Sequence, residues 1–245
     1  DSCVGPKFDP AGNIYVAEQV KPVAQPCPPE FAGLVGKVEV DKSYLEGLKN
    51  EVPSMYGSIV KFSPKGGMFH YPTRKAWDSP YKGEPKPDPS LKTITAAYYS
   101  GHRHKSIKVT GALWMHMGVS HVDMISCNCE NTRFDVDEFG RVFYPDMGRS
   151  RVGVLDTGGN LITEFGGYGN AESKGKDSPV PDGKGLRLRP PKDGEKSPFA
   201  EPEIAFSWLI GVGATDKYAY MGDSLNKRLL RARLTYEVEE SCDIK

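Results

Sequence analysis

Residues 134–166 read FDVDEFGRVFYPDMGRSRVGVLDTGGNLITEFG, and their pattern of apolar segments and turns is the clearest indication of the fold. Gly140 and the glycine pair at 158–159 fall between short apolar segments, where glycine supplies the permissive backbone that a tight hairpin turn needs. The segment Val142–Tyr144 is β-branched and aromatic, as inner strands prefer. The stretch therefore predicts a blade of four antiparallel strands over residues 134–170, with Val142–Tyr144 as an inner strand.

Two further segments follow the same pattern of strand, tight polar turn, apolar strand and acidic residue. One is Phe8–Glu18, which resumes at Ser58–Gly67, and the other is Val212–Asp223, which continues through Asn226–Leu234. Internal self-similarity is the sequence signature of repeat architectures, so it can settle the fold. It predicts an all-β chain with blades near 8–67, 134–170 and 206–236, and with inserts at 19–56, 69–132 and 171–202.

The string from Phe134 to Gly166 resembles the NHL repeat of six-bladed β-propellers. It has the core D-x-x-G-x-V-hydrophobic-x-x-D, then a basic R-x-R, and then V-x-V-x-D-x-x-G-N. The resemblance implies a β-propeller of four-stranded blades, six-bladed when complete, and the chain also resembles exported bacterial NHL-repeat proteins. Propellers have about four to eight blades, so further blades are expected within the inserts or from another segment or chain.

Length and charge narrow the class of protein. The chain has 245 residues with 32 Lys+Arg and 32 Asp+Glu, and this balance argues against a dedicated nucleic-acid binder, which carries a basic excess. With 27 Gly and 20 Pro the composition suits many turns and few long helices, and no apolar run is long enough to span a bilayer. We therefore expect one propeller domain, or the C-terminal part of one, with a protein or small-ligand partner and no transmembrane segment.

The cysteines bear on the compartment. They number 5, so at least one thiol is unpaired or paired outside the chain. Cysteines near both ends favour an oxidising compartment, and an extracytoplasmic location, periplasmic or secreted, is the expectation. At least one disulfide is expected to involve Cys3, Cys27 or Cys242.

The three inserts differ in character. Residues 19–56 begin Pro-rich and become compatible with a helix over Glu39–Asn50, whereas residues 69–132 contain a β-like stretch at Ser106–Trp114. Residues 171–202 are polar, with many Lys, Gly and Pro, and predict a mobile surface loop. Loops this long are usually functional or disordered, so the candidate chemistry is sought in them.

Metal-ligating residue types concentrate in the run from Trp114 to Glu130. Neutral imidazole and thiolate suit zinc or copper, and the candidate ligands are His116, His121, Cys127 and Cys129. Asp123 or Glu130 would orient a ligating imidazole by a hydrogen bond. The spacing matches no standard zinc pattern, so buried methionines and thiols beneath a propeller cap are the competing interpretation.

Other residues of the chain bear on haem ligation, ion pairing and catalysis. The haem attachment motif C-x-x-C-H is absent, although His116, His121 or Met117 are candidates to ligate a haem carried by a partner. Arg149 and Arg151 are expected to pair structurally with Asp146. No G-x-S-x-G, P-loop or dinucleotide fingerprint occurs, and no catalytic residue is assigned.

Three functions are open at this point. The first is an exported binding scaffold that docks a protein or ligand on the loop-bearing face. The second is a metal-dependent propeller enzyme, because gluconolactonase-like and α-amidating-lyase propellers hold calcium or zinc at the central channel. The third is a subunit of a redox complex. Propellers bind through connecting loops, so any functional centre is expected in the His116–Cys129 insert rather than in the blades.

Overall fold

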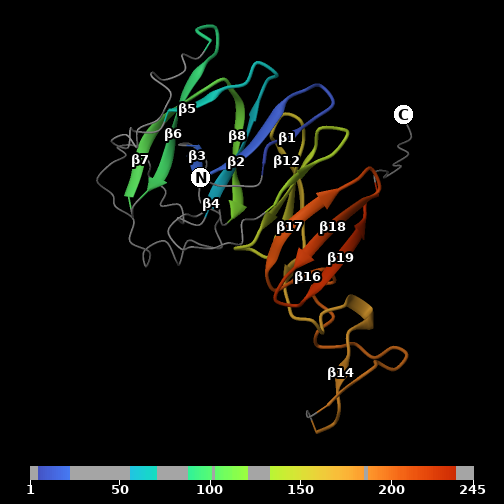
Figure 1. The fold of residues 1–245 in the computed structure, drawn as a ribbon. Helices are drawn as coiled ribbons and strands as arrows, with labels where there is room; N and C mark the ends of the chain where they lie inside the picture. The colour runs from blue at the N-terminus through green and yellow to red at the C-terminus, as the bar shows by residue number, and fades with distance from the viewer. Residues whose placement is uncertain are drawn as a thin grey trace, which may run out of the picture.

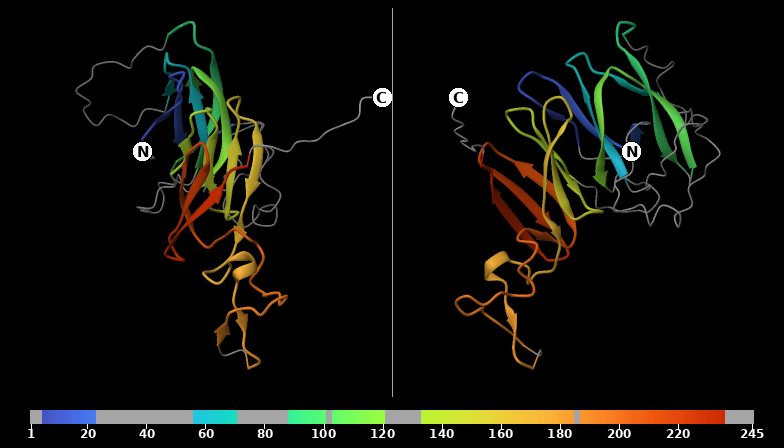
Figure 2. Two further views of the ribbon diagram at one scale, coloured as in Figure 1. Left: turned by 90° about the vertical axis from the view of Figure 1, so that its right-hand side faces the viewer. Right: turned by 180° about the vertical axis from the view of Figure 1, so that it is seen from behind.

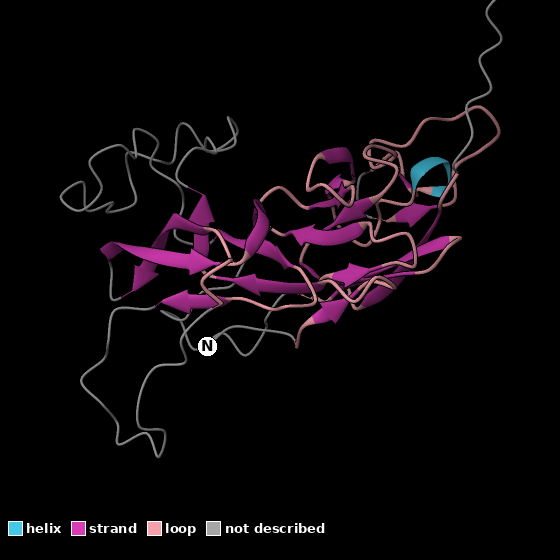
Figure 3. Cartoon of the chain, turned by 90° about the horizontal axis from the view of Figure 1, so that it is seen from above, coloured by secondary structure: helices cyan, strands magenta, loops and turns pink. Residues whose placement is uncertain are grey.

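The computed structural model describes residues 5–22, 56–70, 88–100, 103–120, 133–184 and 187–235, and these form an all-β chain (Figure 1). Among them, a single helical turn, η2 (Gly175–Asp177), interrupts the strands and loops (Figure 3). No helix in these ranges is long and apolar enough to cross a membrane. All the cysteines and the predicted helix at Glu39–Asn50 lie outside the described residues.

The second repeat copy forms a complete four-stranded antiparallel sheet, here called the second sheet. Its strands are β9 (Asp135–Val136), β10 (Val142–Asp146), β11 (Arg151–Leu155) and β12 (Leu161–Phe165), hydrogen-bonded in that order. The predicted sheet of four antiparallel strands is confirmed, with Val142–Tyr144 in an inner strand. Its local turns explain the match, because each hairpin joins strands that are neighbours in sequence.

The first repeat copy forms the first sheet, also antiparallel and four-stranded. Its strands, in order, are β1 (Lys7–Phe8), β2 (Ile14–Glu18), β4 (Tyr56–Phe62) and β8 (Ala112–Ser120). The fourth strand comes from residues 69–132, which the sequence pattern assigned to an insert. Gly111, with a φ of 84°, turns the chain there and divides the β-like stretch Ser106–Trp114 between two sheets.

The strands that precede this turn build an additional sheet, here called the inserted sheet. Its antiparallel order is β3 (Val20–Pro22), β6 (Thr93–Ser100), β7 (Arg103–Thr110) and β5 (Met68–His70). In sequence, β5, β6 and β7 lie between the third and fourth strands of the first sheet, and β3 lies between its second and third strands. The segment expected as a long loop is therefore largely strand wherever it is described.

The third repeat copy forms the third sheet from β17 (Leu209–Ala214), β18 (Tyr218–Asp223) and β19 (Arg228–Arg233). It shares a detail of backbone geometry with the second sheet. Ser150 and Lys227, each four residues after the aspartate that ends the preceding strand, have φ values of 52° and 51°. Because non-glycine residues rarely adopt such values, the shared turn supports the repeat relation.

The four sheets stack face to face in the order inserted, first, second and third (Figures 1 and 2). A separate hydrophobic core fills each of the three interfaces. The core between the inserted and first sheets contains Val60, the core between the first and second sheets contains Tyr15, and the core between the second and third sheets contains Leu209. In β10, Val142 and Tyr144 face the first sheet and Phe143 faces the third. A strand covered on both faces reads as a continuous apolar run, as Val142–Tyr144 does.

An aspartate fixes the turn in each D-x-x-G motif. One carboxylate oxygen accepts hydrogen bonds from the backbone N–H groups two and four residues later, at 2.8–3.0 Å. The fourth residue of each motif has a positive φ of 74–84°, which glycine adopts without strain. The three aspartates are Asp9, Asp137 and Asp156. The aspartate and the glycine of the repeat are thus both needed to form the same turn.

A long excursion, here called the arm (residues 169–204), leaves the second sheet and enters the third (Figure 1). Its ends are held together by β13 (Gly167–Tyr168) and β16 (Ala205–Phe206), which pair in parallel. Within it, β14 (Val180–Pro181) and β15 (Leu188–Arg189) form a short hairpin. The predicted loop at 171–202 therefore contains regular structure in its described part.

Candidate functional site

The predicted metal ligands fall in two parts of the chain. His116 lies in β8, within the first sheet, and its side chain faces the second sheet. The placement differs from the expectation of an insert separate from the repeat segments, because this part of the insert is a strand of the first sheet. His121, Cys127 and Cys129 lie outside the described residues. Within the residues that the structure covers, no group of three His, Cys, Asp or Glu side chains is arranged to hold a metal ion.

His116 contacts Tyr144 across the interface between the first and second sheets. Its Nε2 lies 3.2 Å from the Tyr144 hydroxyl, and the two ring centroids are 5.7 Å apart. Burial lowers the pKa of His116, despite a hydrogen bond to the Gly159 backbone and the charge of Glu164, both of which raise it. The imidazole is therefore held in its neutral form.

Tyr144 is itself immobilised by its surroundings. Burial, assisted by the charges of Asp146 and Glu164, raises the pKa of the Tyr144 hydroxyl well above its usual value. Gly118 and Gly153 lie against the ring, and at either position a Cβ atom would meet it. The phenol is thus a neutral, close-packed group rather than an accessible nucleophile.

An ionic cluster continues from this contact within the second sheet. Arg149 donates from Nε to Oδ2 of Asp146 at 2.6 Å and from Nη1 to Oε2 of Glu164 at 3.0 Å. Arg151 lies 3.5 Å from the same carboxylate. The expected structural pairing of Arg149 with Asp146 is confirmed, and Glu164 is a partner that the sequence did not indicate.

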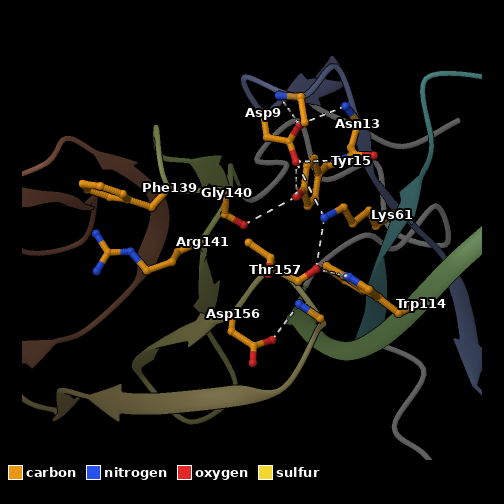
Figure 4. A network of polar contacts seen from close by, with 12 residues as sticks. Asp9, Asn13, Tyr15, Lys61, Trp114, Phe139, Gly140, Arg141, Asp156 and Thr157 are labelled. Carbon is orange, nitrogen blue, oxygen red and sulfur yellow. Dashed lines mark hydrogen bonds and ion pairs between the residues drawn. The ribbon is translucent and has the colours of Figure 1, made fainter.

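Lys61 is the centre of a second polar cluster between the first and second sheets (Figure 4). Its ammonium donates to the Thr157 carbonyl at 3.0 Å and lies 3.6 Å from Oδ2 of Asp9. The indole N–H of Trp114 donates to the same carbonyl at 2.9 Å, and the Tyr15 hydroxyl donates to Asp9 at 2.9 Å. The Thr157 carbonyl, in a turn of the second sheet, therefore accepts hydrogen bonds from two side chains of the first sheet.

The charge of this cluster is stabilised internally. Burial alone would raise the pKa of Asp9, but hydrogen bonds from Asn13 and Tyr15 and the charge of Lys61 outweigh it, so the pKa lies below its usual value. The side chains of Lys61 and Asp9 are only 7% and 6% exposed. Their polar atoms are engaged with one another and with the protein, so this cluster holds two sheets together.

The arm encloses a cleft of about 750 Å³, a size within the range of ligand-binding clefts. Two stretches line it, Gly175–Asp177 and Pro191–Ser197, together with Ala200, Glu201 and Glu203. Among the lining residues are three lysines and five acids, namely Lys176, Lys192, Lys196, Asp177, Asp193, Glu195, Glu201 and Glu203. A surface of mixed charge suits a ligand that itself presents both charges.

Side-chain hydrogen bonds hold the arm in shape. Arg189 binds both carboxylate oxygens of Glu195 at 2.6 and 2.7 Å, and this interaction lowers the pKa of Glu195 to about 2. Ser197 donates to the Pro179 carbonyl at 2.6 Å, and Ser178 to the Phe199 carbonyl at 3.0 Å. These bonds connect the two halves of the arm on either side of the hairpin.

The third sheet anchors the base of the arm. Arg228 donates to the carbonyls of Ser173 at 3.2 Å and Ala205 at 2.6 Å, and Asn226 donates to the Gly169 carbonyl at 3.2 Å. No sequence pattern indicates these long-range hydrogen bonds, although the length and polarity of residues 171–202 marked the segment as a functional candidate. Comparison of the chain with known protein families and with curated proteins gives no match.

Proposed function

We propose that this chain is a binding scaffold of the NHL-propeller kind, in which the stacked sheets are consecutive blades and the arm binds a protein partner. The arm supports this proposal most directly, because it is ordered by its own hydrogen bonds, anchored on the third sheet and hollowed by a charged cleft. A rigid support with a projecting, preorganised surface lowers the entropic cost of binding.

The polar side chains between the first and second sheets support the same proposal. Lys61, Asp9, Arg149 and Glu164 have partners within the fold, and their contacts connect strands or whole sheets. The neutral His116 and Tyr144 likewise bind each other. A partner is therefore expected to bind at the projecting arm and not between the sheets.

A photo-crosslinking experiment tests the proposal with a matched pair of positions. Leu188 in the arm is 48% exposed and Leu161 on β12 is 47% exposed, so a photoreactive phenylalanine analogue at either position reaches solvent equally. In the cells that make the protein, the Leu188 variant should form one discrete adduct and the Leu161 variant none. Equal labelling at both positions, or no adduct from Leu188, would contradict the proposal.

We also propose that the protein is extracytoplasmic and contains a disulfide that involves Cys3, Cys27 or Cys242. The support is the number and spacing of the cysteines in the sequence. Thiol titration of protein purified without reductant, denatured under non-reducing conditions, should find fewer than 5 free thiols. Recovery of every cysteine as a free thiol would contradict both parts.

A further inference from the structure

A row of hydrogen bonds joins three side chains of the inserted sheet, which lies at one end of the stack (Figure 1). Nε2 of His70 in β5 lies 2.8 Å from Oγ1 of Thr110 in β7. Oγ1 of Thr110 in turn lies 2.8 Å from Oγ1 of Thr93 in β6. These three neighbouring strands therefore connect an imidazole and two hydroxyls in a row, here called the relay (His70, Thr110 and Thr93).

The relay lies on the face of the inserted sheet that is turned away from the first sheet. Ile94 and Val109 pack in the hydrophobic core that the inserted sheet shares with the first sheet. Because successive side chains of a strand point to opposite faces, Thr93 and Thr110 lie on the outer face. These two threonines are directly opposite each other in the antiparallel register, and His70 is a diagonal neighbour of Thr110.

The three members of the relay differ in exposure. Thr110 is 2% exposed, so water has little access to its hydroxyl and the hydrogen bonds within the relay have little competition. His70 is half-buried, and Thr93 is exposed. A hydroxyl has one proton to donate and two lone pairs, so Thr110 can donate to one neighbour while it accepts from the other. The relay thus connects a surface hydroxyl to a base.

This geometry meets the requirement for an activated nucleophile. A hydroxyl is a weak nucleophile until a base removes its proton, and the base must lie within hydrogen-bond reach, directly or through one water molecule. In the relay, the Thr110 hydroxyl takes the place of that water. We propose that Thr93 is a nucleophile toward carboxylic esters, with His70 as its general base and Thr110 as the group that transfers the proton.

The reaction proceeds through an acyl-threonine. Oγ1 of Thr93 bonds to the carbonyl carbon of the ester, while its proton passes to Oγ1 of Thr110 and the Thr110 proton passes to Nε2 of neutral His70. The bond between the carbonyl carbon and the alcohol oxygen breaks, and the alcohol leaves with the proton that His70 returns through Thr110. Water then attacks the acyl group by the same route, which releases the carboxylic acid and restores the Thr93 hydroxyl.

A lysine beside the relay favours esters that carry a negative charge. Lys108 pairs with Thr95 across the strands, and its ammonium donates to Oγ1 of Thr95 at 2.7 Å. Thr95 is two residues beyond Thr93, on the same face and about 7 Å further along the strand. A positive charge at that place attracts an anionic substrate to the outer face. Thr95 binds this cation and does not belong to the relay, so it is a matched control for Thr93.

Acid-quenched labelling of the full chain with para-nitrophenyl acetate tests the nucleophile by mass spectrometry. Peptide mapping should place an acetyl group on Thr93 and none on Thr95, which is exposed on the same strand. Hydroxylamine should remove this adduct, because it cleaves an ester but not the amide that forms on lysine. Thr93→Val should abolish the adduct, and Thr95→Val should leave it unchanged. The absence of a hydroxylamine-sensitive adduct on Thr93, or equal labelling of Thr95, would overturn the proposal.

Substitutions within the relay test the route of the proton. His70→Gln and Thr110→Val should each slow the release of nitrophenol about a hundredfold or more. Thr110→Ser keeps the hydroxyl and should retain most of the rate, and circular dichroism of each variant checks that the fold is intact. An unchanged rate in folded His70→Gln, or equal losses in Thr110→Val and Thr110→Ser, would overturn the assignment of the relay.

The charge preference has its own test. Lys108→Met should slow the reaction of the anionic ester para-nitrophenyl succinate several-fold and leave the reaction of neutral para-nitrophenyl acetate unchanged. An equal effect on the two esters would overturn the role of Lys108 in attracting an anionic substrate.

Discussion

Replacement of Gly153 by alanine tests how closely the first and second sheets are packed. Gly153 in β11 pairs with Tyr144 in β10. A Cβ atom at Gly153 would lie 2.5 Å from Cε1 of Tyr144 and nearer still to Cζ and the hydroxyl oxygen, whereas carbon atoms pack at about 3.5–4.0 Å. Tyr144 is 1% exposed, and on its other side the Cβ position of Gly118 is 3.0 Å from Cε2. The ring has no room to move away.

The cost follows from two opposing effects. Overpacking of a closely packed core costs about 1–3 kcal/mol, and the confined ring justifies the upper value. Alanine in a strand gains about 1 kcal/mol over glycine through the entropy of the unfolded chain, which leaves a net loss of about 2 kcal/mol. For a chain of this size, that loss lowers the melting temperature by about 4–8 °C.

Urea denaturation of the wild type and of Gly153→Ala measures the change in the free energy of unfolding. Gly183→Ala is the matched control, since nothing lies within 4 Å of a Cβ atom there. In a Tyr144→Leu background, the cost of Gly153→Ala should fall by at least half, because the atoms that clash are absent. Equal costs at positions 153 and 183, or an unchanged cost in the Tyr144→Leu background, would show that the Tyr144 ring is not the source of the destabilisation.

Three further substitutions test other contacts. Lys61→Met should lower the free energy of unfolding by about 2 kcal/mol, since Asp9 and the Thr157 carbonyl lose a charged donor, whereas exposed Lys65→Met should leave urea unfolding unchanged. Because the folded-state pKa of His116 is lowered, the contribution of His116 to stability is complete above about pH 6.5 and is lost as pH falls. His116→Gln should therefore flatten the pH dependence of the free energy of unfolding in urea between about pH 7 and 5, and an unaltered slope would count against a neutral imidazole. Arg189→Ala should speed thermolysin cleavage of the arm several-fold at an unchanged melting temperature, and an unchanged rate would mean that the pair does not order the arm.

The second sheet was predictable because its information is local. The D-x-x-G turns place an aspartate and a glycine where one hairpin needs both, and Val142–Tyr144 shows the apolar run of a strand buried on two faces. The Arg149–Asp146 ion pair could also be predicted from the sequence, because the two residues are three apart in the chain. These features depend on neighbours within one sheet.

The remaining features depend on partners far away in sequence. Nothing near Ala112–Ser120 indicates that it pairs with Tyr56–Phe62, because register between distant strands is set by the faces they bury and not by a turn. His116 was therefore assigned to a loop, although its neighbour in space is Tyr144. The contacts of Arg228 with the arm were hidden for the same reason.

The position of the inserted sheet has a consequence for how the chain folds. The second sheet closes through consecutive hairpins between Asp135 and Phe165, so it pays little loop-closure entropy. The first sheet joins Phe62 to Ala112 only after the whole intervening segment has been gathered, and such non-local pairing is slow. We therefore expect the second sheet to form in the folding nucleus. We expect β4 to remain an unpaired edge strand until β8 pairs with it. During that interval the open edge is the part of the chain most prone to aggregate.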